Sequence, residues 1–274
     1  MTEWDEVAKY YDLIFGDRKV DIAFWQKMSK MFGSQILELC CGTGRLTFPI
    51  AETGVKVVGM DKSEPMLKEA RKNLKSQSSK VRSRVSFVQG DALSFSYKSK
   101  FKAIFSPWWF GPKDKTEQKS MLTCVKKHLE KDGYFVVDTY NFRERSEDWA
   151  TSYIAFCKDM PNLGFTLVRQ CFDKGSAKDK TSEIVHFLDR VYRNGIVKRI
   201  VTERIDRHYS KSELESVLWE NGFKVVKVYG DYDFGSWTKL SERVIIVAQP
   251  ATFPYFLKLR LLLRQFLVNY AGKI

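Results

Sequence analysis

Three acidic side chains end three successive apolar runs in the first third of the sequence. Glu38 lies in QILELC, Asp61 ends VVGMD, and Asp91 follows VSFVQG. Each run predicts a buried strand, and open α/β sheets bind ligands at the carboxyl ends of their strands. There a carboxylate can accept hydrogen bonds from a cationic amine, from ribose hydroxyls or from the exocyclic amine of adenine. The three positions therefore suit a ligand with an amino-acid end, a ribose and an adenine.

The glycines that follow Glu38 narrow the choice of ligand. Gly42 and Gly44 in GTGR let the backbone turn and approach a ligand closely. A dinucleotide site would need a third glycine and a phosphate cradle, whereas residues 45–47 are Arg, Leu and Thr. The pattern favours S-adenosylmethionine and gives least support to a nicotinamide oxidoreductase.

The surrounding elements alternate as an α/β sheet requires. Two N-terminal helices are expected at about 5–15 and 20–32, and strands at 35–40, 55–60, 85–90, 102–106 and 134–140. Helical spacing falls at 45–54, 64–75 and 115–133, where Gly133 is the expected helix stop. The expected architecture is Rossmann-like, with a seven-stranded, mostly parallel sheet and helices on both faces.

An antiparallel insertion is expected from about 164 to 209. Its period-two runs flank an Asn194-Gly195 pair, which is a strong hairpin signal. A helix with Ser210 as N-cap and Glu213 three residues later follows, and strands at 223–230 and 242–249 complete the sheet. We therefore expect one domain over residues 1–250, which contains this insertion, and a helical tail over 251–274.

The stretch LELCCGTGRLTFPIAETGVKVVGMDKSEPMLKEAR, followed by VSFVQGDAL, resembles the class I S-adenosylmethionine-dependent methyltransferases. The resemblance covers residues from about 8 to 249. YYDLIFGD, NGFKVVKVYGDYD and SERVIIVAQP are similar to the small-molecule subgroup that carries an antiparallel lid. Cys40 takes the place of the first glycine of E-x-G-x-G-x-G, and it should fit if its backbone stays in an ordinary region.

The resemblance implies a set of cofactor contacts. Tyr11 would close over the cofactor and take part in catalysis, although it could instead be an ordinary aromatic of an amphipathic helix. The other implied contacts are Glu38, Gly42 and Gly44 at the methionine end, Asp61 at the ribose, Lys62 and Met66 around the adenine, Asp91 and Ala92 at the adenine edge, and Ser106 at the end of the fourth strand.

Methyl transfer is an in-line displacement, so the protein mainly positions the acceptor and excludes water. A general base is needed only for an acceptor that is still protonated, and His208 could serve a hydroxyl acceptor, although a lone histidine is more often structural. The candidate acceptor-binding residues are Trp108, Trp109, Tyr140, Asn141, Tyr209 and Tyr232. The two tryptophans could equally pack into the core. SPWW partly matches the [DNS]-P-P-[YFW] motif of nucleic-acid amino-group methylases.

Charge and cysteine content limit the partners. The formal net charge is +13, and residues 62–84 are strongly basic, which suits phosphates or anionic lipid if it is more than a solvated face. The five cysteines form no CxxC pair, so we expect reduced thiols, a cytoplasmic location and no metal site. The N-terminus has no export pattern. Asp138 has no accompanying carboxylates for Mg²⁺, so a structural role is preferred.

The tail, residues 251–274, contains no acidic residue and has an apolar helical face interrupted by basic side chains. It could lie in a membrane interface, which would suit a lipid-like or quinone-like acceptor, or pack on protein. We therefore expect an enzyme that transfers methyl from S-adenosylmethionine to an N or O atom of a small molecule. The alternatives are a nucleic-acid methyltransferase, one acting on a lipid at a membrane, and a binding module of the same fold without turnover.

Overall fold

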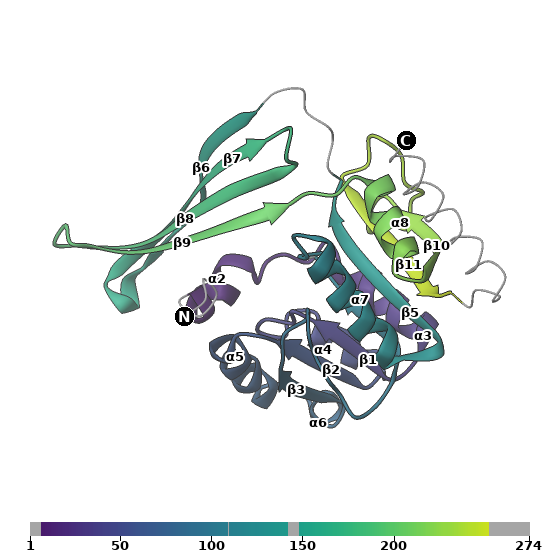
Figure 1. Cartoon of the computed structure of the whole chain (residues 1–274). Coiled ribbons are helices and arrows are strands. Elements are labelled where there is room, and N and C mark those ends of the chain that lie inside the picture. The colour runs from purple at the N-terminus through teal and green to yellow at the C-terminus, as the bar shows by residue number, and fades with distance from the viewer. Residues whose placement is uncertain (1–6, 109, 142–147, 252–274) are drawn as a thin grey trace.

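The computed structural model describes residues 7–108, 110–141 and 148–251. A seven-stranded sheet with flanking helices forms one body, and a separate four-stranded antiparallel sheet projects from one end of it (Figure 1). The expected fold class is confirmed. Among the described helices, none has the length and apolar content that a membrane crossing requires. The expected tail helix lies outside the described residues.

The large sheet has the strand order β10-β11-β5-β4-β1-β2-β3. Its strands are β1 (Ile36–Leu39), β2 (Val57–Asp61), β3 (Val85–Gln89), β4 (Phe101–Ser106), β5 (Leu129–Tyr140), β10 (Phe223–Tyr229) and β11 (Arg243–Pro250). Only β11 runs against its neighbours, β5 and β10. Because β1, β2 and β4 are parallel neighbours, their carboxyl ends meet at one edge of the sheet.

Helices cover both faces of this sheet. The helices are η1 (Ala8–Tyr10), α2 (Tyr11–Phe15), α3 (Ile22–Phe32), α4 (Thr47–Glu52), α5 (Glu64–Lys75), α6 (Ser79–Arg82), α7 (Lys115–His128) and α8 (Lys211–Glu220). Buried side chains of α7 and α8 join one core cluster, which contains Leu37 and Leu39. Those of α3 and α4 join a second cluster with Ile36 on the opposite face. Side chains of β1 therefore contribute to the core clusters on both faces of the sheet.

The expected helix stop at Gly133 is wrong. Helix α7 ends at His128, and β5 begins at Leu129 and runs through Gly133. Leu129 pairs with Phe101 of β4 and is only 2% exposed. Tertiary pairing thus takes Leu129 into the sheet, although its spacing also fits the helix.

The lid is larger than the sequence predicts. It contains β6 (Trp149–Met160), η2 (Pro161–Leu163), β7 (Phe165–Ser176), β8 (Thr181–Tyr192) and β9 (Val197–Arg207) in the order β6-β7-β8-β9. The expected bounds of 164–209 omitted β6. This edge strand is mostly exposed and carries a bulge between Ile154 and Phe156, so its sequence lacks clean alternation.

The N-terminal segment lies between the lid and the large sheet (Figure 1). Leu13 and Ile14 of α2 pack against Leu167 and Leu188 on one face of the lid. On the other side, Asp12 accepts hydrogen bonds from Thr43, beyond β1, and from Asn73 of α5. The short α2 is therefore held from both sides.

Candidate active site

A pocket opens at the carboxyl ends of β1 and β4, which is the edge of the sheet where the sequence predicts ligand binding. Its lining comes from α2, the loop after α2, the loop after β1 and the loop after β4. The residues are Tyr11, Phe15, Arg18, Glu38, Cys40, Cys41, Arg45, Leu46, Pro107 and Trp108. Tyr11, Glu38 and Trp108 were expected at a site, and the structure brings all three to this cavity.

The loop after β1 has a left-handed backbone at three alternate positions. Cys40, Gly42 and Gly44 have φ values of 56°, 57° and 89°. The condition stated for Cys40, an ordinary backbone region, is therefore not met, and its side chain lies at a position that favours glycine. The Tyr11 ring lies 3.8 Å from the place that a Cβ on Gly42 would take, whereas a Cβ on Gly44 would come within 2.7 Å of the Phe48 ring. Side chains therefore pack closely against the backbone of this loop.

Asp61 ties this loop to β2. Its Oδ2 accepts the Gly42 N–H at 2.8 Å and its Oδ1 accepts the Ser63 N–H at 2.9 Å. Ser63 in turn caps α5 by accepting the N–H of Met66, which is only 2% exposed. The expected ribose contact thus also organises the loop beside it.

The expected adenine-edge residues lie together at the end of β3. Lys62 Nζ donates to Asp91 Oδ2 at 2.7 Å, and Ala92 beside it is 5% exposed. Burial would raise the pKa of Asp91, but the hydrogen bonds from Lys62 and from the Leu93 N–H lower it overall. Asp91 is therefore an ionised acceptor at this edge.

Glu38 is buried at the floor of the pocket, with 3% of its surface exposed. Thr47 Oγ1 donates to its Oε2 at 2.5 Å. Burial raises the pKa of Glu38 to about 8, although Thr47 and Arg45 act to lower it. The side chain is therefore mostly protonated at neutral pH.

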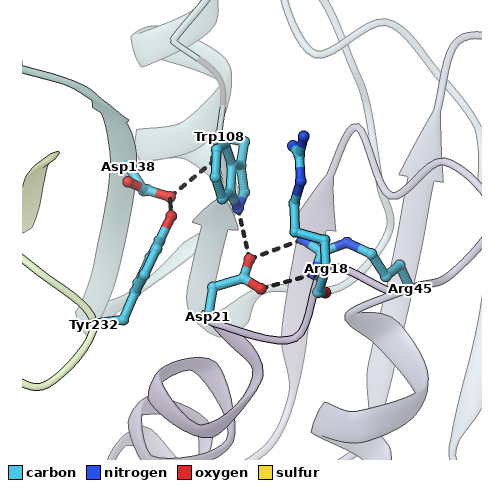
Figure 2. Close-up of polar contacts among 6 residues, drawn as sticks. All are labelled: Arg18, Asp21, Arg45, Trp108, Asp138 and Tyr232. Atoms are coloured by element: carbon cyan, nitrogen blue, oxygen red, sulfur yellow. Dashed lines mark hydrogen bonds and ion pairs between the residues drawn. The ribbon is translucent and has the colours of Figure 1, made fainter. Parts of the chain in front are cut away.

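Trp108 forms the opposite wall and is fixed by two acidic residues (Figure 2). Its Nε1–H donates to Asp21 Oδ2 at 2.6 Å, and its backbone N–H donates to Asp138 Oδ2 at 3.2 Å. Its φ is 59°, a left-handed conformation that tryptophan rarely adopts. Arg45 holds Asp21 through two hydrogen bonds of 2.7 and 2.8 Å. Burial would raise the pKa of Asp21, but the hydrogen bonds from Arg45 and Trp108 lower it overall.

Asp138 lies at the centre of a group of buried hydrogen bonds, in keeping with the structural role that was preferred over magnesium binding. It is fully buried, accepts from the Tyr232 hydroxyl at 2.9 Å, and pairs with Arg243 at 2.7 Å. The Arg243 Cζ lies 4.1 Å from the Trp108 ring centroid and 4.2 Å from that of Tyr140. Of the residues expected to contact the acceptor, Tyr140 and Tyr232 therefore pack against the ring of Trp108. Ser106, which precedes this loop, is fully buried.

The structure places other expected site residues away from this pocket. Tyr209 is 2% exposed in the core, where its hydroxyl donates to the Pro112 carbonyl. His208 Nε2 lies 2.8 Å from Ser182 Oγ in the lid. Asn141 donates to the Ser241 carbonyl at 2.8 Å. Trp109 lies outside the described residues.

Sequence reasoning overlooked several residues that build this site. Phe15 and Arg18 line the pocket, while Asp21 and Arg243 orient its Trp108 wall. Arg45 also lines the pocket, and its place directly after the glycines of GTG is a signal that the sequence offered for it. Across the described residues, no three His, Cys, Asp or Glu side chains are grouped as a metal site would need.

Comparisons with known proteins agree with this geometry. A family model described as a methyltransferase domain matches residues 32–192. A putative methyltransferase from Geobacillus is 24% identical over 90% of this chain and 99% of that protein. A demethylmenaquinone methyltransferase from Lactococcus lactis is 38% identical over 27% of this chain, and the match spans only 29% of that protein.

Solved structures share the fold. The CcbJ methyltransferase from Streptomyces caelestis has a TM-score of 0.76 and 22% identity over 92% of this chain and 99% of that one. CalS10, an amino pentose methyltransferase from Micromonospora echinaspora solved with S-adenosylmethionine bound, has a TM-score of 0.63 and 17% identity over 89% of this chain and 97% of that one. The matched family model covers more than half of the chain, so the protein belongs to the methyltransferase domain family.

Proposed function

We propose that this enzyme methylates an amine or hydroxyl of a small polar molecule that reaches the pocket beside Trp108, under the lid. The observation that carries the proposal is the single cavity shared by the left-handed loop after β1 and the Trp108 wall. The loop is the expected place of the cofactor's methionine end, and the wall is the expected place of the acceptor. One cavity can therefore hold the two reacting atoms within contact distance.

The residues around this cavity fit the cofactor. Gly42 has a positive φ that glycine adopts without strain, and the Tyr11 ring lies across from its Cα, so a ligand at this loop would meet both. When bound, S-adenosylmethionine supplies a methyl group on a positively charged sulfur. Tyr11, Phe15 and Trp108 provide aromatic surface that excludes water and favours a cation.

Tyr11 acts in this proposal as a neutral phenol. Burial raises its pKa, although Arg45 and Arg18 act in the opposite direction. A phenol with a raised pKa is a poor base near neutral pH, so Tyr11 would close the cavity and donate a hydrogen bond. His208 is held by Ser182 in the lid, so the acceptor nitrogen or oxygen would lose its proton to water or to another group.

Structural neighbours support a polar acceptor as the first class to test. CalS10 is named as an amino pentose methyltransferase, and its chain shares this fold over 97% of its length. The likeness to demethylmenaquinone methyltransferase is confined to 27% of this chain and supports a quinone acceptor less. The nucleic-acid alternative is weakened because Lys62, Arg71 and Lys72 of the basic segment each pair with a carboxylate. Five free cysteines suit the cytoplasmic location that we include in the proposal.

Calorimetry with S-adenosylmethionine, S-adenosylhomocysteine and NAD tests the cofactor site. We expect binding of the first two alone, and a loss of at least about tenfold in affinity in Asp61→Ala, because two ribose hydrogen bonds are removed. Glu52→Ala removes an exposed carboxylate from nearby α4 and should leave affinity unchanged. Because Asp61 also anchors the loop, Asp61→Asn and thermal melting separate ligand contact from loop damage. Normal binding by Asp61→Ala would refute the ribose assignment.

Formation of S-adenosylhomocysteine then tests the acceptor. Amino sugars, phenols, polynucleotide and quinone-containing liposomes represent the competing classes. Turnover only with polynucleotide or liposomes would overturn the small-molecule proposal. For the liposome arm, a chain lacking residues 251–274 is the matched control, since loss of association would assign lipid contact to the tail.

A further inference from the structure

Two guanidinium groups lie close to the ring of Phe15, a residue that lines the pocket. The Arg18 Cζ lies 5.1 Å from the centroid of this ring and 4.7 Å from that of Trp108. The Arg169 Cζ, from lid strand β7, lies 5.0 Å from the Phe15 centroid. The large domain and the lid thus each bring one positive charge to the same aromatic side chain.

The positive charge of Arg18 is not cancelled by the acidic groups of the pocket. Asp21 is already engaged by Arg45 and Trp108, and the Arg18 side chain extends away from that pair (Figure 2). In the described ranges 7–108, 110–141 and 148–251, no carboxylate lies within ion-pair distance of Arg18. Arg18 is also exposed, so it can reach a ligand.

Arg169 has polar neighbours on its own face of the lid. Arg169 Nη2 lies 3.0 Å from His186 Nε2 on β8. His186 pairs in register with Thr202 of β9, whose side chain is 7% exposed and whose Oγ1 has no hydrogen-bond partner. Arg169 therefore continues into a polar part of this lid face, which it forms with His186 and Thr202.

We propose that the pocket mouth binds an anionic group of the methyl acceptor, a phosphate or a carboxylate, between Arg18 and Arg169. The planar guanidinium fork matches the oxygens of either anion and stays charged at all physiological pH values. The inference rests on the proposed function, because it describes the far end of the acceptor whose near end lies at Trp108. In this arrangement Arg18 and Arg169 select the acceptor, and methyl transfer itself takes place in the pocket beside Trp108.

The test measures anion binding to protein saturated with S-adenosylhomocysteine, with inorganic pyrophosphate and succinate as probes. We expect Arg18→Ala and Arg169→Ala each to raise the dissociation constant of the preferred probe about tenfold or more, since each removes a charged hydrogen-bond donor. Lys19→Ala, on the same loop, and Lys174→Ala, on the opposite face of β7, remove the same charge and should change it less than about twofold. Binding of pyrophosphate alone would assign a phosphate group, and binding of succinate alone a carboxylate.

Three results would overturn the inference. They are the absence of binding by either probe, equal weakening by the lysine variants, and an equal loss of S-adenosylhomocysteine affinity in the arginine variants. The last would mean that the guanidinium groups hold the cofactor. Melting curves and Arg169→Lys control for damage to the lid. Failure of the unaltered protein to bind S-adenosylhomocysteine would refute the proposed function instead, so the two failures are distinguishable.

Discussion

The indole N–H of Trp108 donates to Asp21 over 2.6 Å, and this bond joins the loop after β4 to the residue before α3. The Asp138 carboxylate fixes the same tryptophan through its backbone N–H. Two contacts therefore hold Trp108, whose backbone is in the left-handed region.

Trp108→Phe should slow methyl transfer more than it weakens cofactor binding. Phenylalanine keeps an aromatic face but loses the Asp21 hydrogen bond, so the acceptor wall is less well ordered. We expect kcat to fall about tenfold, with less than about a threefold change in the dissociation constant of S-adenosylhomocysteine. Trp219→Phe, an exposed tryptophan on α8, is the matched control. Equal loss of both quantities would contradict a role limited to the acceptor side.

Glu38→Gln should stabilise the ligand-free protein much more at pH 8 than at pH 5. In the folded chain the pKa of Glu38 is about 8, above its ordinary value of 4.5. Between these two values the unfolded chain loses a proton that the folded chain retains, so the free energy of unfolding falls as pH rises. Glutamine is neutral throughout and can still accept from Thr47. Melting at pH 8 should rise by about 2–4 °C for each kcal/mol regained, whereas a constant difference at both pH values would exclude titration.

Cofactor binding at pH 7 should release protons if its ammonium group approaches Glu38. A nearby cation favours the carboxylate form, so the proton held by Glu38 in the free protein would pass to the buffer. Calorimetry in two buffers of different ionisation enthalpy measures the number of protons released on binding. We expect a value between zero and one proton that disappears in Glu38→Gln. The same release in the variant would move its source to another group.

Gly44→Ala should cost more stability than Gly54→Ala. Both glycines have positive φ, so both substitutions carry backbone strain of about 1 kcal/mol. Only at Gly44 would the added Cβ meet an aromatic ring, at 2.7 Å from Phe48, whereas nothing lies within 4 Å at Gly54. Overpacking should add about 1–3 kcal/mol, measured from urea midpoints. Equal losses would show that the Phe48 ring moves aside freely.

Cys40→Gly should stabilise the protein by about 0.5–1 kcal/mol, because glycine adopts a φ of 56° without steric cost. Cys40→Val should destabilise it by more than about 1 kcal/mol, because a branched Cβ is least tolerated there. The two variants change one side chain in opposite directions, and chemical unfolding ranks them. A Cys40→Gly protein less stable than the parent would show that the thiol makes contacts worth more than the strain.

The sequence allowed the large sheet to be predicted because its signals are local. Buried runs such as residues 36–39 need both faces apolar, and a carboxylate at the end of each run indicates the binding edge. The left-handed φ of Cys40 and the Asp21 contact to Trp108 were not predictable, since each depends on segments distant in the chain. Strand β6 was missed because an exposed edge strand needs no alternation, and Leu129 was misplaced because strand pairing overrode helical spacing.

Helix α2 has a kinetic consequence that follows from its two sets of contacts. One side packs on the lid through Leu13 and Ile14, and the other side meets the loop after β1 through Asp12 and the ring of Tyr11. A ligand that orders this loop therefore also restrains the lid, and by reciprocity a restrained lid retains the ligand. Such coupling favours an ordered reaction, in which the cofactor enters first and the spent cofactor leaves last.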